Sequence, residues 1–197
     1  MRILNAEFVK SVVAPEKVNN DSLPELCFIG RSNVGKSSII NSLTGRKIAR
    51  TSSTPGATRV INIFKIRYES DGEKKDVIFS DFPGFGYSKV SRTESQSWQR
   101  MIERYILKNK QIKKIIWLFD IRREMDKLDV MLMEWFFDNE LKFCFVLVKS
   151  DKEKQGDLTK KKRFFDDYLK GIPIFLFSSK TGQGKNELLS FISSTLK

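Results

Sequence analysis

The chain has 197 residues, 40% of them hydrophobic, which suits one domain with a sizeable core and argues against a disordered protein. It contains no histidine, which excludes His-based zinc sites and nucleophiles activated by histidine. The net charge of +12 favours a polyanionic partner such as nucleic acid, although a merely lysine-rich, solvated surface would give the same value.

The N-terminal part of the chain predicts an arm rather than a membrane or export segment. We expect residues 1–22 to pack on a domain formed by residues 23–197, with Phe8, Val9, Val12 and Val13 on one apolar face. No apolar run reaches the ~18 residues of a membrane span, and the first residues make a poor signal peptide. We therefore expect a cytoplasmic protein with no membrane partner.

The next segment fits the phosphate-loop pattern G-x-x-x-x-G-K-[ST] at every fixed position. Its residues are Gly30, Arg31, Ser32, Asn33, Val34, Gly35, Lys36 and Ser37. The two glycines let the backbone curl closely around phosphates, the lysine can reach their outer oxygens, and the serine hydroxyl can ligate Mg²⁺. A predicted strand before the loop and a helix after it give the context that the motif requires.

Residues 45–58 lack apolar periodicity and lie between the first predicted helix and the second strand. They are either a plain linker or a switch segment whose hydroxyl completes a metal site. Predicted strands at 60–68 and 76–80 flank the turn signal Asp71-Gly72 and should form an antiparallel pair at a sheet edge.

The second of these strands ends at Asp81, followed by Phe82, Pro83 and Gly84. An acid at the carboxyl end of a strand beside the phosphate loop suits the outer shell of Mg²⁺, and the Gly84 N–H can meet a γ-phosphate.

The remaining chain alternates helix and strand. Predicted helices lie at 94–108, 128–137, 158–169 and 185–196, and strands at 115–119, 143–148 and 173–177. This order predicts a three-layer α/β/α domain whose mostly parallel six-stranded sheet has one antiparallel edge strand.

The strand at 143–148 runs into Val148, Lys149, Ser150 and Asp151. A carboxylate there can accept hydrogen bonds from guanine N1–H and N2–H, two donors that adenine lacks. The Lys149 stem can stack over the base, and the loop with Ser178 and Ser179 can offer a backbone N–H to guanine O6. The order of these pieces favours GTP over ATP.

At this point the chain resembles the EngB (YihA/YsxC) family of bacterial TRAFAC-class P-loop GTPases over nearly its whole length. The most specific stretches are residues 6–11, 30–38, 49–56 and 81–90, the last reading DFPGFGYSKV. Asp120-Ile121-Arg122 with Asp129 is also similar to that family.

The resemblance implies a Ras-like GTPase fold, GTP and GDP as ligands, Mg²⁺ as cofactor and slow intrinsic hydrolysis. It implies that residues 30–37 hold the phosphates and that Lys36, Thr58 and Gly84 act in catalysis. Ser37 and Thr58 would ligate the metal. The residues expected along the nucleotide are Gly56, Ala57, Thr58, Arg59 and Val60, then Asp81, Phe82, Pro83 and Gly84, and at the base Val148, Lys149, Ser150, Asp151, Phe177, Ser178 and Ser179.

The resemblance also implies a monomer that acts in assembly of the large ribosomal subunit, with its RNA as partner, and that is needed for cell division and septation. Two other functions stay open: a basic RNA-binding protein that uses GTP only as a structural ligand, and a P-loop kinase acting on a small molecule.

Two positions depart from the usual GTPase pattern. Val148 stands where Asn or Thr is common and cannot donate a hydrogen bond from its side chain. Phe85 stands where many GTPases place a glutamine that orients water, as the EngB resemblance leads one to expect. Hydrolysis must then use another group. In some relatives, an Asn at the position of Asn33 helps to hold K⁺ beside the phosphates; alternatively, Asn33 only makes a turn hydrogen bond.

Overall fold

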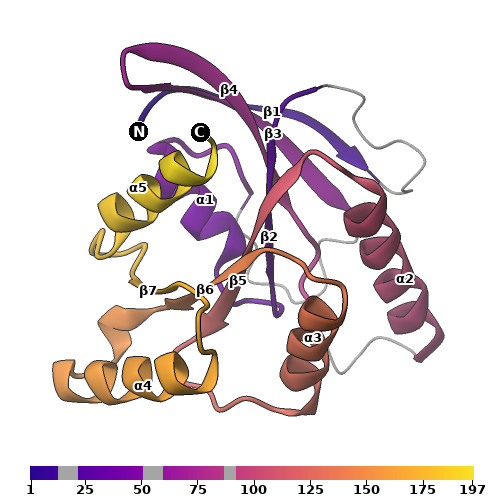
Figure 1. Ribbon diagram of the computed structural model, residues 1–197, viewed down its shortest axis with the longest axis vertical. Helices are drawn as coiled ribbons and strands as arrows, with labels where there is room; N and C mark the ends of the chain where they lie inside the picture. The colour runs from indigo at the N-terminus through magenta and orange to yellow at the C-terminus, as the bar shows by residue number, and fades with distance from the viewer. Residues whose placement is uncertain (13–21, 51–59, 87–91) are drawn as a thin grey trace.

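The computed structural model describes residues 1–12, 22–50, 60–86 and 92–197, and for 92–99 the backbone alone. Helices lie on both faces of a single sheet, which gives the three layers that the alternation of strand and helix predicted (Figure 1). Predictions that concern Val13 of the arm or residues 51–59 lie outside the described residues.

The sheet has seven strands in the spatial order β1-β3-β4-β2-β5-β6-β7. The strands are β1 (Arg2–Val12), β2 (Glu25–Gly30), β3 (Ile61–Ser70), β4 (Glu73–Asp81), β5 (Ile112–Asp120), β6 (Phe143–Val148) and β7 (Ile174–Phe177). The helices are α1 (Lys36–Thr44), α2 (Arg92–Lys108), α3 (Lys127–Asp138), α4 (Gln155–Tyr168) and α5 (Lys185–Thr195), and a 3₁₀ turn η2 (Ser150–Lys152) follows β6.

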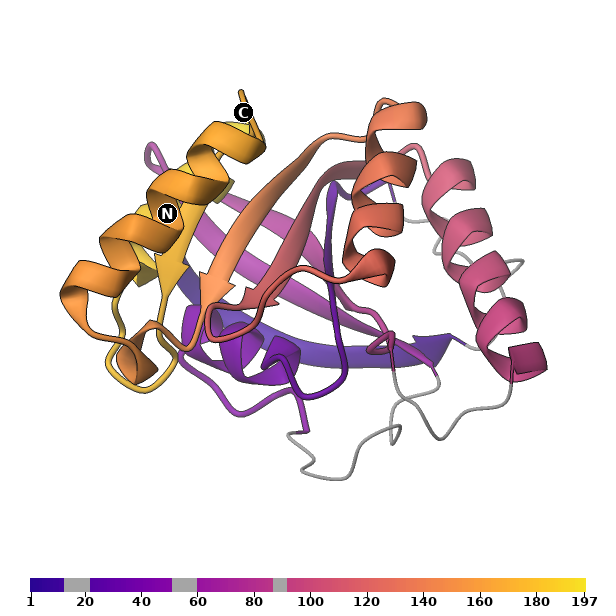
Figure 2. The same ribbon diagram turned by 90° about the horizontal axis from the view of Figure 1, so that it is seen from below.

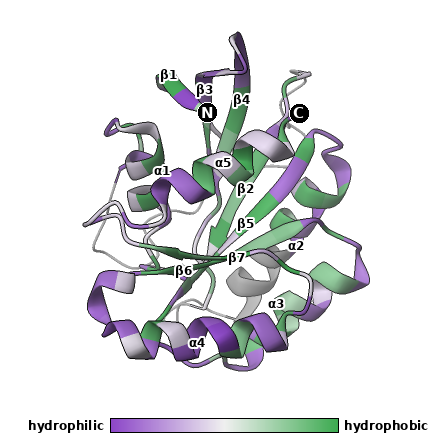
Figure 3. Ribbon diagram, turned by 60° about the vertical axis from the view of Figure 1, so that its left-hand side comes forward, coloured by the Kyte–Doolittle hydropathy of each residue, from purple (hydrophilic) through white to green (hydrophobic). Residues whose placement is uncertain are grey.

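The strands β4, β2, β5, β6 and β7 pair in parallel. Both β2 and β6 are buried at every residue, as expected for parallel strands that carry helices on both faces. Figure 3 shows these central strands in green, against the more hydrophilic α4. The carboxyl ends of all five strands point to one edge of the sheet, where ligands of open α/β sheets bind.

The antiparallel pairing of β3 and β4 is confirmed, with a continuous register from Asn62 opposite Asp81 to Ser70 opposite Glu73. The turn between them is Asp71-Gly72, and both residues have positive φ, as a tight hairpin turn requires. This hairpin brings Asp81 to the same edge as the end of β2.

The prediction of six strands with this hairpin at the edge is wrong, because β1 pairs antiparallel with β3 and forms a seventh strand outside it. The expected apolar face of the arm is also only partly correct. Ala6 and Val12 are buried, but Phe8 and Val9 are 53% and 44% exposed. Two register shifts interrupt the alternation of side chains along β1, so its apolar residues do not all lie on one face. The pairing of its backbone with β3 could not be predicted from the side chains. β1 thus belongs to the same sheet as the rest of the chain.

The helices pack on the two faces of the sheet (Figure 2), and two apolar clusters fill the space between them. Under α1 and α5 the cluster includes Leu43 and Leu188. Under α2, α3 and α4 it is built on aromatic rings, with Trp117 against Phe136 and Phe145 at centroid distances of 5.6 and 4.7 Å. Each such buried ring contributes on the order of 2–3 kcal/mol to folding. This packing therefore stabilises the sheet whose edge carries the site.

A buried acid connects α2 to the edge of the sheet that lies opposite the ligand edge. Glu25, at the start of β2, accepts hydrogen bonds from the Tyr105 hydroxyl at 2.8 Å and from the Asn109 amide at 2.7 Å. The Ser80 hydroxyl also donates to it. Because these donors satisfy the carboxylate, the polar cluster is a structural joint, and it lies away from the loops that follow the strands.

Candidate nucleotide-binding site

The phosphate loop lies between β2 and α1, as the motif predicted. Its two motif glycines are needed for different reasons. An ideal Cβ on Gly30 would lie 2.6 Å from the Leu118 carbonyl oxygen, so this glycine permits close packing against β5. Gly35 has open space but a φ of +116°, which a residue with a side chain rarely adopts. Asn33 also has positive φ, a conformation that Asn tolerates better than most residues.

Lys36 starts α1, and its side chain is folded back under the loop. Its Nζ donates to the carbonyl oxygens of Gly30 at 3.2 Å and Arg31 at 3.0 Å. Burial lowers the pKa of Lys36 to about 8, although Asp81 opposes the shift. A polyphosphate at this loop would supply the counter-charge that the lysine lacks.

Ser37 and Asp81 form the candidate metal position. The Ser37 hydroxyl donates to Asp81 Oδ2 at 3.0 Å. Asp81 is 3% exposed, and its Oδ1 has no hydrogen-bond partner among the described residues. Burial raises the pKa of Asp81, against the effects of Lys36 and Ser37. A buried oxygen with a free lone pair beside a hydroxyl fits a hard cation such as Mg²⁺, so the residues present fit the expected metal.

The described residues hold no cluster of three or more His, Cys, Asp or Glu side chains that could cage a metal. A Mg²⁺ ion beside a nucleotide does not require such a cluster, because it keeps waters and phosphate oxygens as ligands and takes only one or two from protein. Thr58, the second expected ligand, lies outside the described residues, as do Gly56, Ala57 and Arg59; Val60 is half-buried just before β3.

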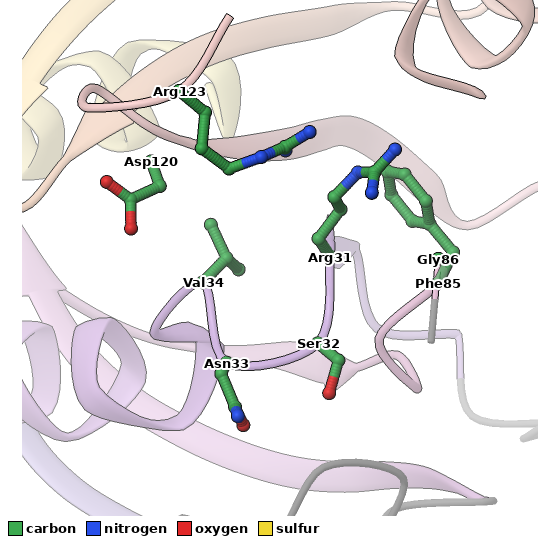
Figure 4. Close-up of a pocket in the computed structure, with 8 residues that line it drawn as sticks. All are labelled: Arg31, Ser32, Asn33, Val34, Phe85, Gly86, Asp120 and Arg123. Carbon is green, nitrogen blue, oxygen red and sulfur yellow. The ribbon is translucent and has the colours of Figure 1, made fainter. Parts of the chain in front are cut away.

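The segment after β4 lies directly on the phosphate loop (Figure 4). Phe82 is fully buried and meets Tyr105 edge to face, and Pro83 is buried beside it. An ideal Cβ on Gly84 would lie 2.5 Å from Ser32 Cα, so only glycine allows this approach. The segment is therefore already next to the place where the loop would present a terminal phosphate.

At the end of β6, Lys149 has a left-handed backbone with φ +62°. Its Nζ donates to the Asn33 carbonyl oxygen at 2.9 Å and lies 2.9 Å from Asp120 Oδ2. The lysine stem thus spans the gap between the turn after β6 and the phosphate loop. Val148, just before it, is buried in the sheet and offers no side-chain hydrogen bond.

Asp151 lies in η2, and its Oδ1 accepts a hydrogen bond of 2.7 Å from the Ser178 hydroxyl. This bond holds the pKa of Asp151 below its usual range, so the carboxylate is ionised at neutral pH. Ser150 is buried and donates to Gln183 Oε1 at 2.8 Å. These bonds join the turn after β6 to the loop after β7, as the expected base site requires.

Two other predicted base contacts have different surroundings. The ring of Phe177 is fully buried in the core under α5, so only its backbone can face a ligand. Ser179 is exposed in the loop after β7.

A family model described as a 50S ribosome-binding GTPase matches residues 25–150 of the chain. The probable GTP-binding protein EngB of Clostridium perfringens (strain SM101 / Type A) is 40% identical over 201 residues, which cover 100% of this chain and 98% of that protein. The chain belongs to the EngB family of P-loop GTPases. The P-loop GTPase fold and the EngB resemblance that the sequence predicted are thereby confirmed.

Solved structures agree with the fold of this EngB family member. The structure of Era from Aquifex aeolicus bound to GDP·AlF₄⁻ superposes with a TM-score of 0.75 at 21% identity, over 89% of this chain and 57% of that one. The structure of a probable GTP-binding protein engB gives a TM-score of 0.63 at 21% identity, over 87% of this chain and 98% of that one. No helix of the described residues is long and apolar enough to cross a membrane.

The site residues expected from the sequence do not include Asp120, at the end of β5. Arg122 holds it in a fork, with Nε and Nη2 at 2.9 and 2.7 Å from its two oxygens. Burial opposes its ionisation, but hydrogen bonds from Arg122 and Lys149 hold its pKa well below the usual range. In this EngB-family chain Asp120 therefore fixes Lys149. Its place at the end of a strand next to β2 was the available signal.

A cavity of about 230 Å³ lies between the phosphate loop and the segment that joins β5 to α3 (Figure 4). This is smaller than the ~300–1,000 Å³ of most small-molecule sites. The residues that line it are Arg31, Ser32, Asn33, Val34, Phe85, Gly86, Asp120 and Arg123. Arg31 and Arg123, from distant parts of the chain, therefore share one space beside the loop.

Proposed function

We propose that this protein binds GTP and GDP with Mg²⁺ and hydrolyses GTP slowly, as a monomeric cytoplasmic switch in assembly of the large ribosomal subunit. The observation that carries the proposal is the pairing of the phosphate loop with Lys149 and Asp151, through Asn33 on one side and Ser178 on the other. A carboxylate fixed there matches the two N–H donors of guanine, whereas adenine would leave it unpaired.

The chemistry of hydrolysis needs positive charge and N–H donors around the phosphates. Lys36 and the loop N–H groups would supply these, while Gly84 would place its N–H at the γ-phosphate. Ser37 would ligate the metal directly, Asp81 would act through its outer shell, and Thr58 would be the second protein ligand. When bound, Mg²⁺ neutralises charge on the phosphate oxygens.

Water activation cannot use the usual glutamine, because the residue after Gly84 is Phe85. We propose that K⁺ near Asn33 adds the missing positive charge. The Asn33 side chain is exposed and makes no hydrogen bond within the described part of the chain, so its amide is available to a cation.

The proposed partner is the large ribosomal subunit and its RNA. The net charge of +12 and the ribosome-binding description of the matching family model support this. Three basic residues after α1, Arg46, Lys47 and Arg50, are exposed and could contact RNA phosphate. In α4, Lys162 pairs with Asp166, which leaves that lysine less free to meet phosphate. A role in cell division and septation would follow from the supply of ribosomes.

The test is co-sedimentation of the protein with large ribosomal subunits, in GDP and in a non-hydrolysable GTP analogue. We expect the GTP form to pellet with the subunits and the GDP form to stay largely free. Binding should weaken steeply with salt, because neutralised RNA phosphates release counterions. Lys47→Glu should lower the log–log salt slope by about one, with Lys160→Glu on α4 as the matched control.

Two results would overturn the proposal. Binding of ATP as tight as that of GTP would remove the base assignment. Equal association in both nucleotide states, with a salt slope near zero, would remove the ribosomal switch.

A further inference from the structure

We infer that Arg31 is a positioning residue, which ties the phosphate loop to the start of α3 and holds Phe85 and Gly86 against the loop. It thereby sets the rate of GTP hydrolysis more than nucleotide affinity. The inference rests on the proposed GTPase function, but its structural half can be tested in the nucleotide-free protein.

Arg31 belongs to the phosphate-loop motif, yet its guanidinium is bound by carboxylates of another element. Its Nε donates to Asp129 Oδ1 at 3.2 Å, and its Nη2 donates to Asp126. The Arg31 side chain is 17% exposed and that of Asp129 only 1%. The contact joins residues 98 positions apart, and its low exposure reduces screening by solvent.

The two carboxylates that hold Arg31 also begin α3. Asp126 is the N-cap and accepts from the N–H groups of Leu128 and Asp129, while Asp129 accepts from the Asp126 N–H at 3.2 Å. Arg123 adds a second cation to Asp129 at 3.1 Å. Because the buried charge of Asp129 depends on these partners, the first turn of α3 and the phosphate loop are held at a fixed distance.

On its other side Arg31 contacts the segment after Gly84. Arg31 and Phe85 form a parallel β-bridge, and the Ser32 N–H donates to the Phe85 carbonyl oxygen at 3.1 Å. The guanidinium lies 5.6 Å from the centre of the Phe85 ring (Figure 4), within reach of a cation–π contact. An ideal Cβ on Gly86 would lie 2.8 Å from Arg31 Nη1, so the guanidinium fills the space above that glycine.

These contacts meet at Gly84, because the bridge fixes its neighbour Phe85 to the loop. GDP has no γ-phosphate, so its binding depends on Lys36, the loop N–H groups and the base site. Hydrolysis also needs Gly84 at the γ-phosphate in the transition state. Removing the guanidinium should then reduce turnover and leave GDP binding largely unchanged.

The experiment compares Arg31→Ala, Arg31→Lys and Asp126→Asn with the wild type. Asparagine is as good an N-cap as aspartate, so Asp126→Asn removes the charge and keeps the start of α3. Arg67→Ala is the matched control, because Arg67 makes a similar fork with Asp76 far from the site. The readouts are single-turnover GTP hydrolysis, GDP affinity, and amide hydrogen exchange of Ser32 without nucleotide.

We expect Arg31→Ala to slow hydrolysis about tenfold or more while GDP affinity changes less than about threefold, and Asp126→Asn to act in the same direction. Arg31→Lys should rescue the rate only in part, since an ammonium lacks the separate Nε and Nη2 donors that contact Asp129 and Asp126. Exchange at Ser32 should speed up in both Arg31 variants and not in Arg67→Ala.

Unchanged hydrolysis in Arg31→Ala and Asp126→Asn, or an equal loss of GDP affinity and rate, would overturn the inference. So would Ser32 exchange in the wild type as fast as in Arg31→Ala. If Ser32 exchange responds as expected but the wild type hydrolyses no GTP, the proposed function fails and the role in hydrolysis fails with it, while the structural link stands.

Discussion

The Ser178 hydroxyl donates a hydrogen bond of 2.7 Å to Oδ1 of Asp151, and so joins the loop after β7 to the turn after β6. The Ser178 oxygen accepts in turn from the N–H groups of Lys180 and Thr181. Its single proton is thus directed to the carboxylate. Asp151 is therefore ionised and oriented before any base arrives, which reduces the cost of recognition.

The first prediction concerns base choice. Asp151→Asn should weaken GTP binding by about 2–5 kcal/mol, because guanine loses a charge-assisted pair. Binding of xanthosine triphosphate, which has a carbonyl where guanine has its amino group, should improve. Calorimetric titration with both nucleotides measures this exchange. Asp167→Asn, on the exposed side of α4, should change neither affinity; a preference for GTP that survives Asp151→Asn would contradict the assignment.

The second prediction follows from Lys36, whose pKa in the free protein is about 8 because it is buried. Phosphate charge beside the ammonium raises that pKa in the complex. Protonation of Lys36 should therefore contribute an uptake of about half a proton on binding at pH 8, and almost none at pH 6.5. GDP affinity should fall as the pH rises above 8, since the free lysine must then be protonated before it can bind.

Proton uptake is measured by titration calorimetry with GDP in two buffers of different ionisation enthalpy. Lys36→Met should bind GDP more weakly and lose the uptake at pH 8. The same enthalpy in both buffers for the wild type would show that Lys36 is already charged.

The third prediction concerns Asn33, whose left-handed backbone is a purely conformational reason for its presence. Asn33→Gly keeps that backbone and removes the amide. If the amide helps to hold K⁺, the wild type should hydrolyse GTP faster in K⁺ than in matched Na⁺ buffer, and Asn33→Gly should lose the difference. Equal rates of the wild type in both salts would reject the cation role, and a K⁺ effect that persists in Asn33→Gly would assign it to other groups.

The fourth prediction concerns stability away from the site. Tyr105→Phe should lower the free energy of unfolding by about 1–3 kcal/mol, because buried Glu25 loses a hydrogen-bond donor. GDP affinity should not change. Urea denaturation measures the loss, and Tyr168→Phe on α4, where the side chain is 46% exposed, should be close to neutral. An equal effect of both changes would show that Glu25 does not depend on that hydroxyl.

The phosphate loop could be predicted from the sequence, because its motif is contiguous and Gly35 adopts a positive φ that glycine allows locally; the close packing of Gly30 on Leu118 of β5 is a tertiary contact. The order of strands and helices from β2 onward could also be predicted, since apolar periodicity reports local burial. Asp81 and Asp151 were predicted for a related reason: Asp81 ends β4, and Asp151 lies three residues after β6, so both are at the carboxyl ends of strands, where ligands bind.

The contacts that fix these pieces to one another became visible only in the folded chain. The contact of Arg31 with Asp129 and that of Lys149 with Asp120 depend on strand order and on the entry of α3, which no local pattern encodes. β1 is the seventh strand because its backbone hydrogen-bonds to that of β3. All residue types except proline can make both bonds of such a ladder, so the residues of β1 do not predict the pairing. The ring of Phe177 points into the core under α5, where its burial stabilises the fold. Many pairings of distant strands and side chains are equally compatible with the local sequence. The packing of the whole chain determines which of them forms.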